Sequence, residues 1–60
     1  MEDLIREYSL REDPGVQEAI ELLKLHKDQP AELLRYLDQN MEGGPRILET
    51  LYMDLLAYLQ

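Results

Sequence analysis

The sequence predicts an all-α protein: a small bundle of three to four short helices that is completed by homodimerisation. Three observations support this fold class. Apolar residues recur at intervals of three and four along most of the chain, which is the period of an amphipathic helix. Each of the three prolines precedes such a stretch, where a helix tolerates the missing N–H. A chain of 60 residues can form only one domain with a small core. Because it contains no cysteine, no disulfide can stabilise that core.

The prolines divide this single domain, residues 1–60, into four segments. The expected helices cover residues 2–9, 14–27, 30–42 and 45–60. The first carries Leu4, Ile5 and Tyr8 at helical spacing, but it is too short to be stable by itself. Asp13 is the expected N-terminal cap of the second helix, with Pro14 as its first residue.

The third expected helix begins at Pro30, and Leu33 and Leu37 mark its apolar side. Gly43 and Gly44 follow its last turn, where glycine commonly adopts the left-handed conformation that ends a helix. Pro45 is the expected first residue of the fourth helix. Because the connections are short, we expect consecutive helices to pack as neighbours.

The fourth expected helix is the most apolar segment of the chain. At 100° per residue, its apolar side chains cover an arc of roughly 180°, which is wider than one small core needs. This helix should therefore be central in the bundle or give part of its surface to a partner. We expect five of its residues to divide their apolar surface between the core and a subunit interface: Leu48, Leu51, Tyr52, Leu55 and Leu59. Self-association would compensate for the small core.

The charge of the chain restricts its partners. Thirteen acidic and six basic residues give a net charge of −7, which repels phosphate backbones and anionic lipid surfaces. The segment 14–42 could be drawn as a helix-turn-helix, but its third helix carries Glu32, Asp38 and Glu42 against Arg35 alone. We therefore expect no direct binding to nucleic acid. The same acidity leaves one alternative open, an inhibitor that mimics nucleic acid and blocks the basic channel of a DNA- or RNA-binding protein.

No arrangement of residues indicates catalysis, a metal site or a cofactor. Ser9 and Thr50 both have simpler structural uses, and a bundle of this size rarely encloses a substrate pocket. His26 lies near the end of the second helix, where the helix dipole favours its protonated form. Leu22 and Pro30, four residues to either side of this histidine, are not metal ligands.

We therefore expect a non-enzymatic protein–protein interaction module, a small regulatory or adaptor protein or the association domain of a larger one. Its partners would be a second copy of itself and another protein. No apolar run is long enough to cross a membrane. The acidic residues Glu2 and Asp3 are unlike the basic start of a signal peptide, so we expect a cytoplasmic protein.

Overall fold

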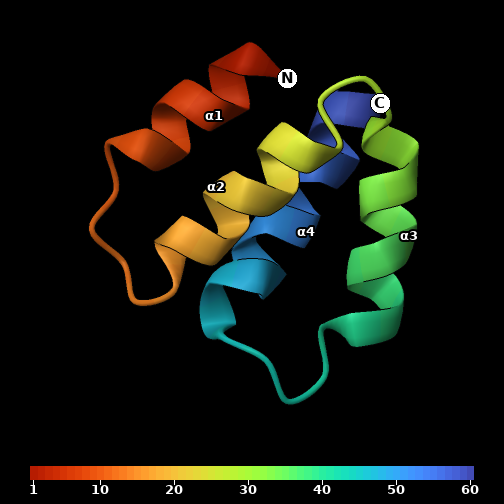
Figure 1. The fold of residues 1–60 in the computed structure, drawn as a ribbon. Coiled ribbons are helices and arrows are strands. Elements are labelled where there is room, and N and C mark those ends of the chain that lie inside the picture. Colours follow the sequence, from red (N-terminus) through yellow and green to blue (C-terminus); the bar gives the residue numbers. More distant parts are fainter.

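Four helices account for most of the chain in the computed structural model, which describes residues 1–60 (Figure 1). Their bounds are α1 Glu2–Ser9, α2 Val16–Leu25, α3 Pro30–Asn40 and α4 Arg46–Leu59. There is no strand, so the expected all-α fold is confirmed. None of the four helices combines the length and the apolar character needed to cross a membrane.

The helices form two hairpins, α1 with α2 and α3 with α4, in which the paired helices run in opposite directions (Figure 1). The second hairpin packs on the first mainly through α2, which contacts each of the other three helices. The backbone of α1, in contrast, packs against α2 alone. The central helix is thus α2, and α4 lies to one side of it with part of its surface facing solvent.

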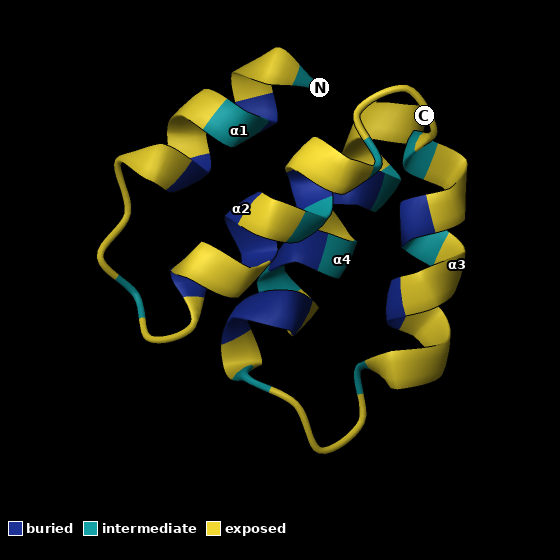
Figure 2. Cartoon of the chain, in the orientation of Figure 1, coloured by how far each residue is buried: buried dark blue, intermediate teal, exposed yellow.

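The core lies between the facing sides of all four helices (Figure 2). Its buried residues are Leu4, Tyr8, Val16, Ala19, Ile20, Leu23, Leu33, Leu37, Ile47, Leu48, Leu51 and Leu55. All twelve are hydrophobic, and no charged side chain is buried. Ala19 has no accessible surface, and its small side chain lets the backbone of a neighbouring element come close to α2.

The start of α2 differs from the expectation. Asp13 does not cap the helix, because its carboxylate accepts a hydrogen bond from Arg11 instead. The residue before the helix is Gly15, whose φ of +80° lies in the left-handed region that side chains disfavour. A Cβ atom on Gly15 would stand 3.1 Å from Pro45 Cβ and 3.2 Å from Ile47 Cγ2. Glycine therefore both sets the start of α2 at Val16 and allows the close approach of α4.

The turn between α3 and α4 also depends on glycine. The third helix ends at Asn40, whose side-chain amide donates a hydrogen bond to the backbone oxygen of Tyr36. Gly43 then adopts a φ of +80° in open surroundings. Pro45 is extended and precedes the first residue of α4, so it ends the turn and is not itself helical.

Two side-chain hydrogen bonds connect α1 with α4. The Tyr8 hydroxyl donates to the Asp54 carboxylate at 2.5 Å, and the Met1 amine donates to the Tyr58 hydroxyl at 2.9 Å. Tyr8 is only 1% exposed, whereas Asp54 is half-buried. Burial and the hydrogen bond to Asp54 raise the pKa of the Tyr8 phenol well above its ordinary value. This bond links α1 and α4, whose backbones are not in contact.

Alanine substitutions at Gly15 and Gly43 separate two effects of glycine: its tolerance of a left-handed backbone conformation, and the close approach that its missing side chain allows. Gly43→Ala should lower the free energy of unfolding by about 1 kcal/mol, the cost of a left-handed conformation alone. Gly15→Ala adds a clash with Pro45 and Ile47, so its loss should be about 2 to 3 kcal/mol. Urea unfolding followed by circular dichroism measures both values. If both variants lost the same free energy of unfolding, the contact between the starts of α2 and α4 would not contribute to stability.

Tyr8→Phe should lower the free energy of unfolding at pH 7 by about 1 to 2 kcal/mol, because Asp54 loses a hydrogen-bond donor. The phenol resists ionisation in the folded state, whereas the unfolded phenol ionises near its ordinary pKa of about 10. The wild-type chain should therefore lose stability as the pH rises above about 10, and Tyr8→Phe should lose less. Tyr36→Phe, at an exposed tyrosine, is the control and should behave as wild type in urea titrations at each pH.

Candidate functional site

The five residues expected at a subunit interface separate into two groups. Leu48, Leu51 and Leu55 point into the chain's own core and are buried. Tyr52 is half-buried, and Leu59 is 41% exposed. Three of the five are therefore covered by α4's neighbours in the same chain, and only the other two have surface that a partner could reach.

The accessible apolar surface of α4 extends from these two residues. Leu56 is half-buried, and Met53 is 66% exposed. Because side chains three or four positions apart share a helix face, Tyr52, Leu56 and Leu59 form a continuous stripe, with Met53 at its outer edge. The stripe lies beside α3, which packs against α4.

One residue of α3 extends this surface. The Tyr36 ring lies 6.3 Å from the His26 ring at the end of α2, so this side of α3 faces α2. Leu34, two positions earlier, lies on the opposite flank and therefore on the α4 side. Leu34 is half-buried and packs against the core. We define the α3–α4 face as Leu34, Tyr52, Met53, Leu56 and Leu59.

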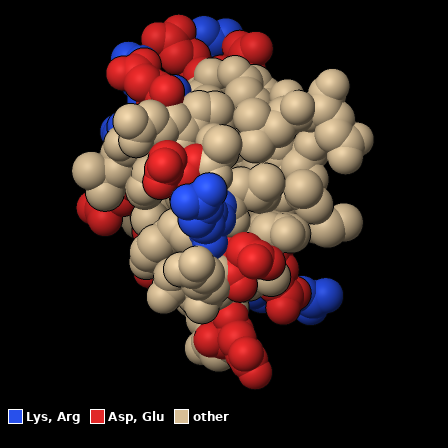
Figure 3. All heavy atoms as spheres, turned by 90° about the vertical axis from the view of Figure 1, so that its right-hand side faces the viewer, with Lys and Arg blue, Asp and Glu red and all other residues tan.

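Charged and uncharged areas both occur on this side of the molecule. Figure 3 views the molecule from the side of α3 and shows a broad uncharged area. Acidic and basic side chains lie in separate groups around it. For a chain with a net charge of −7, such an area is the place where another protein surface can approach with the least repulsion.

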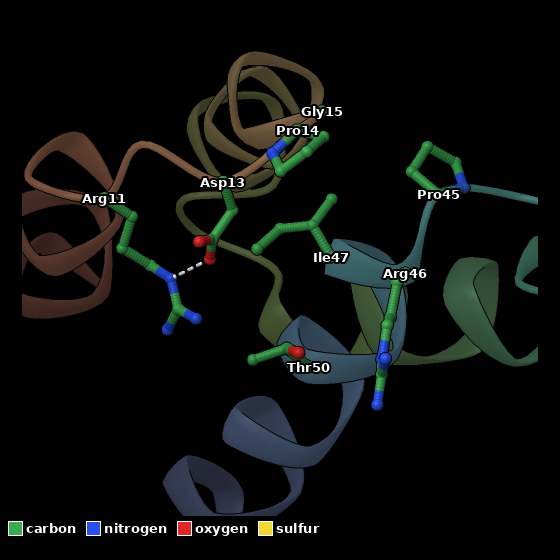
Figure 4. A pocket seen from close by; sticks show the side chains of 8 residues that line it. All are labelled: Arg11, Asp13, Pro14, Gly15, Pro45, Arg46, Ile47 and Thr50. Carbon is green, nitrogen blue, oxygen red and sulfur yellow. Dashed lines mark hydrogen bonds and ion pairs between the residues drawn. The ribbon is translucent and has the colours of Figure 1, made fainter.

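A groove of about 600 Å³ lies on another side of α4, where its first turn meets the segment before α2 (Figure 4). The residues that line it are Arg11, Asp13, Pro14, Gly15, Pro45, Arg46, Ile47 and Thr50. Pocket volumes of a few hundred Å³ or more suit small ligands or a few residues of a peptide. The groove is open to solvent, so it is a surface depression and not the enclosed substrate pocket that a bundle of this size rarely forms.

The arginines of the groove differ in their partners. The Arg11 Nε–H donates to Asp13 Oδ2 at 2.6 Å, and the guanidinium lies 5.4 Å from the centre of the Tyr8 ring. The hydrogen bond to Asp13 raises the pKa of Arg11 further, so this side chain stays charged. Arg46 forms no ion pair, and the Thr50 hydroxyl makes no hydrogen bond within the chain. In Figure 4 the two arginines lie on opposite sides of Thr50.

Sequence reasoning did not find the groove. Arg11 and Arg46 are far apart in the chain, and no motif connects them. Leu34 and Leu56 on the α3–α4 face were visible as apolar residues at helical spacing, but their exposure depends on how α2 and α3 cover α4. For Leu56, the available signal was its position at the edge of the apolar arc, about a quarter of a turn from the centre.

The remaining surface has fewer features that indicate a binding site. A second, shallower depression of about 420 Å³ lies between the start of α1 and the end of α4, and its lining includes Glu2, Asp3 and Asp28. No cluster of three His, Cys, Asp or Glu side chains that could hold a metal ion is present. His26 Nδ1 lies 2.9 Å from the Leu22 carbonyl oxygen, a local contact within the last turn of α2.

Comparison of the chain with protein-family models, curated proteins and solved structures finds no match. Any function must therefore be argued from the surfaces of this chain.

Proposed function

We propose that the protein is a non-enzymatic interaction module that self-associates through its α3–α4 face. The observation that carries this proposal is the accessible surface of a continuous stripe on α4 whose residues, Tyr52, Met53, Leu56 and Leu59, all lack charge. Leu59 and Met53 are 41% and 66% exposed, so burying them against a partner would stabilise an assembly by the hydrophobic effect. The biological role that fits is that of a small regulatory or adaptor protein.

A second copy of the chain is the partner that the charge distribution favours. Two copies that carry −7 each repel one another, and the repulsion is smallest where both surfaces lack charge. In a two-fold dimer the same face is used twice, so an uncharged face meets another uncharged face. Tyr52 suits such a contact, because its ring can be buried while its hydroxyl reaches water at the rim.

The buried leucines of α4 support this face indirectly. Leu48, Leu51 and Leu55 fix the rotation of α4 in the bundle, and this rotation turns Leu56 and Leu59 outward. We keep Tyr52 and Leu59 as interface residues from the sequence-based set and add Leu56. The cytoplasmic location expected from the acidic residues Glu2 and Asp3 and from the lack of a long apolar run stays a prediction.

Leu59→Lys tests the self-association. A charged ammonium group in the centre of an apolar contact would be costly to bury, so we expect the substitution to weaken the dimer by about tenfold or more. Because Leu59 is partly exposed in the last turn of α4, the fold should be retained. Light scattering coupled to size exclusion, over a range of about 10 to 200 µM protein, measures the mass.

Leu10→Lys is the matched control. Leu10 is 80% exposed beyond the end of α1, away from the α3–α4 face, so this variant should retain the wild-type mass. A wild-type mass of one chain throughout the concentration range would overturn the proposal. Equal loss of mass in both variants would also contradict it, because the effect would then not belong to the face.

A second candidate is the acidic inhibitor that mimics nucleic acid, and one observation favours it. Several acid–base pairs at helical spacing, Glu7 with Arg11 among them, do not form ion pairs. The ion pairs present are Arg11 with Asp13 and Glu2 with Lys27. Many carboxylates are thus available to a basic partner. On the side shown in Figure 3, however, they lie in separate groups and not in a continuous row.

Salt distinguishes the two candidates. Raising the salt concentration to about 0.5 M should weaken binding of a charge mimic to its target strongly, whereas an apolar dimer should change little. The comparison uses the wild-type chain, with light scattering for the dimer and with retention on an immobilised polycation for the mimic.

A further inference from the structure

We propose that the groove between the segment 11–15 and the start of α4 binds an acidic side chain of a partner peptide, with apolar residues flanking the carboxylate. This site is separate from the α3–α4 face. Thr50 and Tyr52 are two positions apart in α4, so they point about 200° apart around the helix. The groove and the face therefore lie on nearly opposite sides of α4 and could be occupied together.

The charges of the groove fit one carboxylate. Its lining contains two guanidinium groups and one carboxylate, which leave one positive charge. Asp13 occupies the Nε–H of Arg11, so the terminal nitrogens of Arg11 and the whole guanidinium of Arg46 can donate to a ligand. Arginine binds carboxylates with two parallel hydrogen bonds, and such charge-assisted bonds are stronger than neutral ones.

Two further donors lie in the same place. The Thr50 hydroxyl has no partner in the chain, and it lies between the two arginines (Figure 4). The helix α4 begins without a side-chain cap, and in its first turn the Leu48 N–H donates to the Pro45 carbonyl oxygen, whereas the preceding amides of Arg46 and Ile47 have no side-chain acceptor. A carboxylate held by Arg46 would give these groups the acceptor that the chain itself does not supply.

The walls of the groove indicate which residues should flank the carboxylate in the ligand. Pro14, Pro45 and Ile47 present carbon atoms, so the segments beside the carboxylate should be apolar. The charge of the whole chain, −7, makes a polyanion such as nucleic acid a poor occupant, because each additional phosphate is repelled by the surrounding acids. A single carboxylate benefits from the local positive charge and adds the least repulsion.

A peptide titration tests the proposal. The probe is acetyl-Leu-Glu-Leu-amide, and acetyl-Leu-Gln-Leu-amide is its neutral counterpart. Binding is followed by the amide signals of the ¹⁵N-labelled chain. We expect the acidic peptide to shift the signals of Gly15, Ile47 and Thr50, and to bind at least about fivefold more tightly than the neutral peptide.

Arg46→Gln should weaken binding of the acidic peptide by about fivefold or more. Arg35→Gln is the matched control: it removes the same charge from an exposed position of α3, so it should bind within about twofold of wild type. The spectra of both variants also report whether the fold is retained.

Several outcomes would overturn the proposal. One is equal binding of the acidic and neutral peptides, and another is no shift of the groove signals up to about 5 mM peptide. Equal weakening by Arg35→Gln and Arg46→Gln would show that only the overall charge matters. A third peptide, acetyl-Leu-Gln-Leu with a free carboxyl end, distinguishes a terminal carboxylate. If it alone binds, the groove recognises chain ends and not acidic side chains.

Discussion

The contact between the start of α2 and the start of α4 determines much of this structure. Gly15 takes a left-handed conformation there and lies so close to Pro45 and Ile47 that an added Cβ would make tight contacts of 3.1 and 3.2 Å with their side chains. Because each helix belongs to a different hairpin, this contact fixes how the two hairpins meet. It also brings the segment that carries Arg11 to the first turn of α4. The core packing and the groove therefore both depend on the absence of a side chain at Gly15.

The number of helices and their approximate positions could be predicted from the sequence, because apolar periodicity and proline placement are local signals. The start of α2 could not. Asp13 before Pro14 is a good local cap, but its carboxylate is bound by Arg11, and the helix begins at Val16. The conformation of Gly15 reflects its contact with Pro45, thirty positions later in the chain, and local rules do not contain that contact.

The wide apolar arc of α4 could be predicted from the sequence. Which of its residues are buried in the core and which lie at the surface could not. Covering by α2 and α3 places Leu51 and Leu55 in the core and leaves Leu56 and Leu59 at the surface. Periodicity gives the width of an apolar face, whereas the direction in which that face is turned depends on its neighbours. The groove was beyond prediction for a stronger reason, since Arg11 and Arg46 become neighbours only in the folded chain.

The position of α1 affects the dynamics of the molecule. Its backbone packs on α2 alone, and the hydrogen bonds of Tyr8 and Met1 connect it with α4. Its side chains Leu4 and Tyr8 nevertheless belong to the buried core. Because its backbone contacts only one other helix, we expect the amides of α1 to open at a lower free energy in hydrogen exchange than those of the other three helices. Such an opening would uncover the side of α2 that Leu4 and Tyr8 protect.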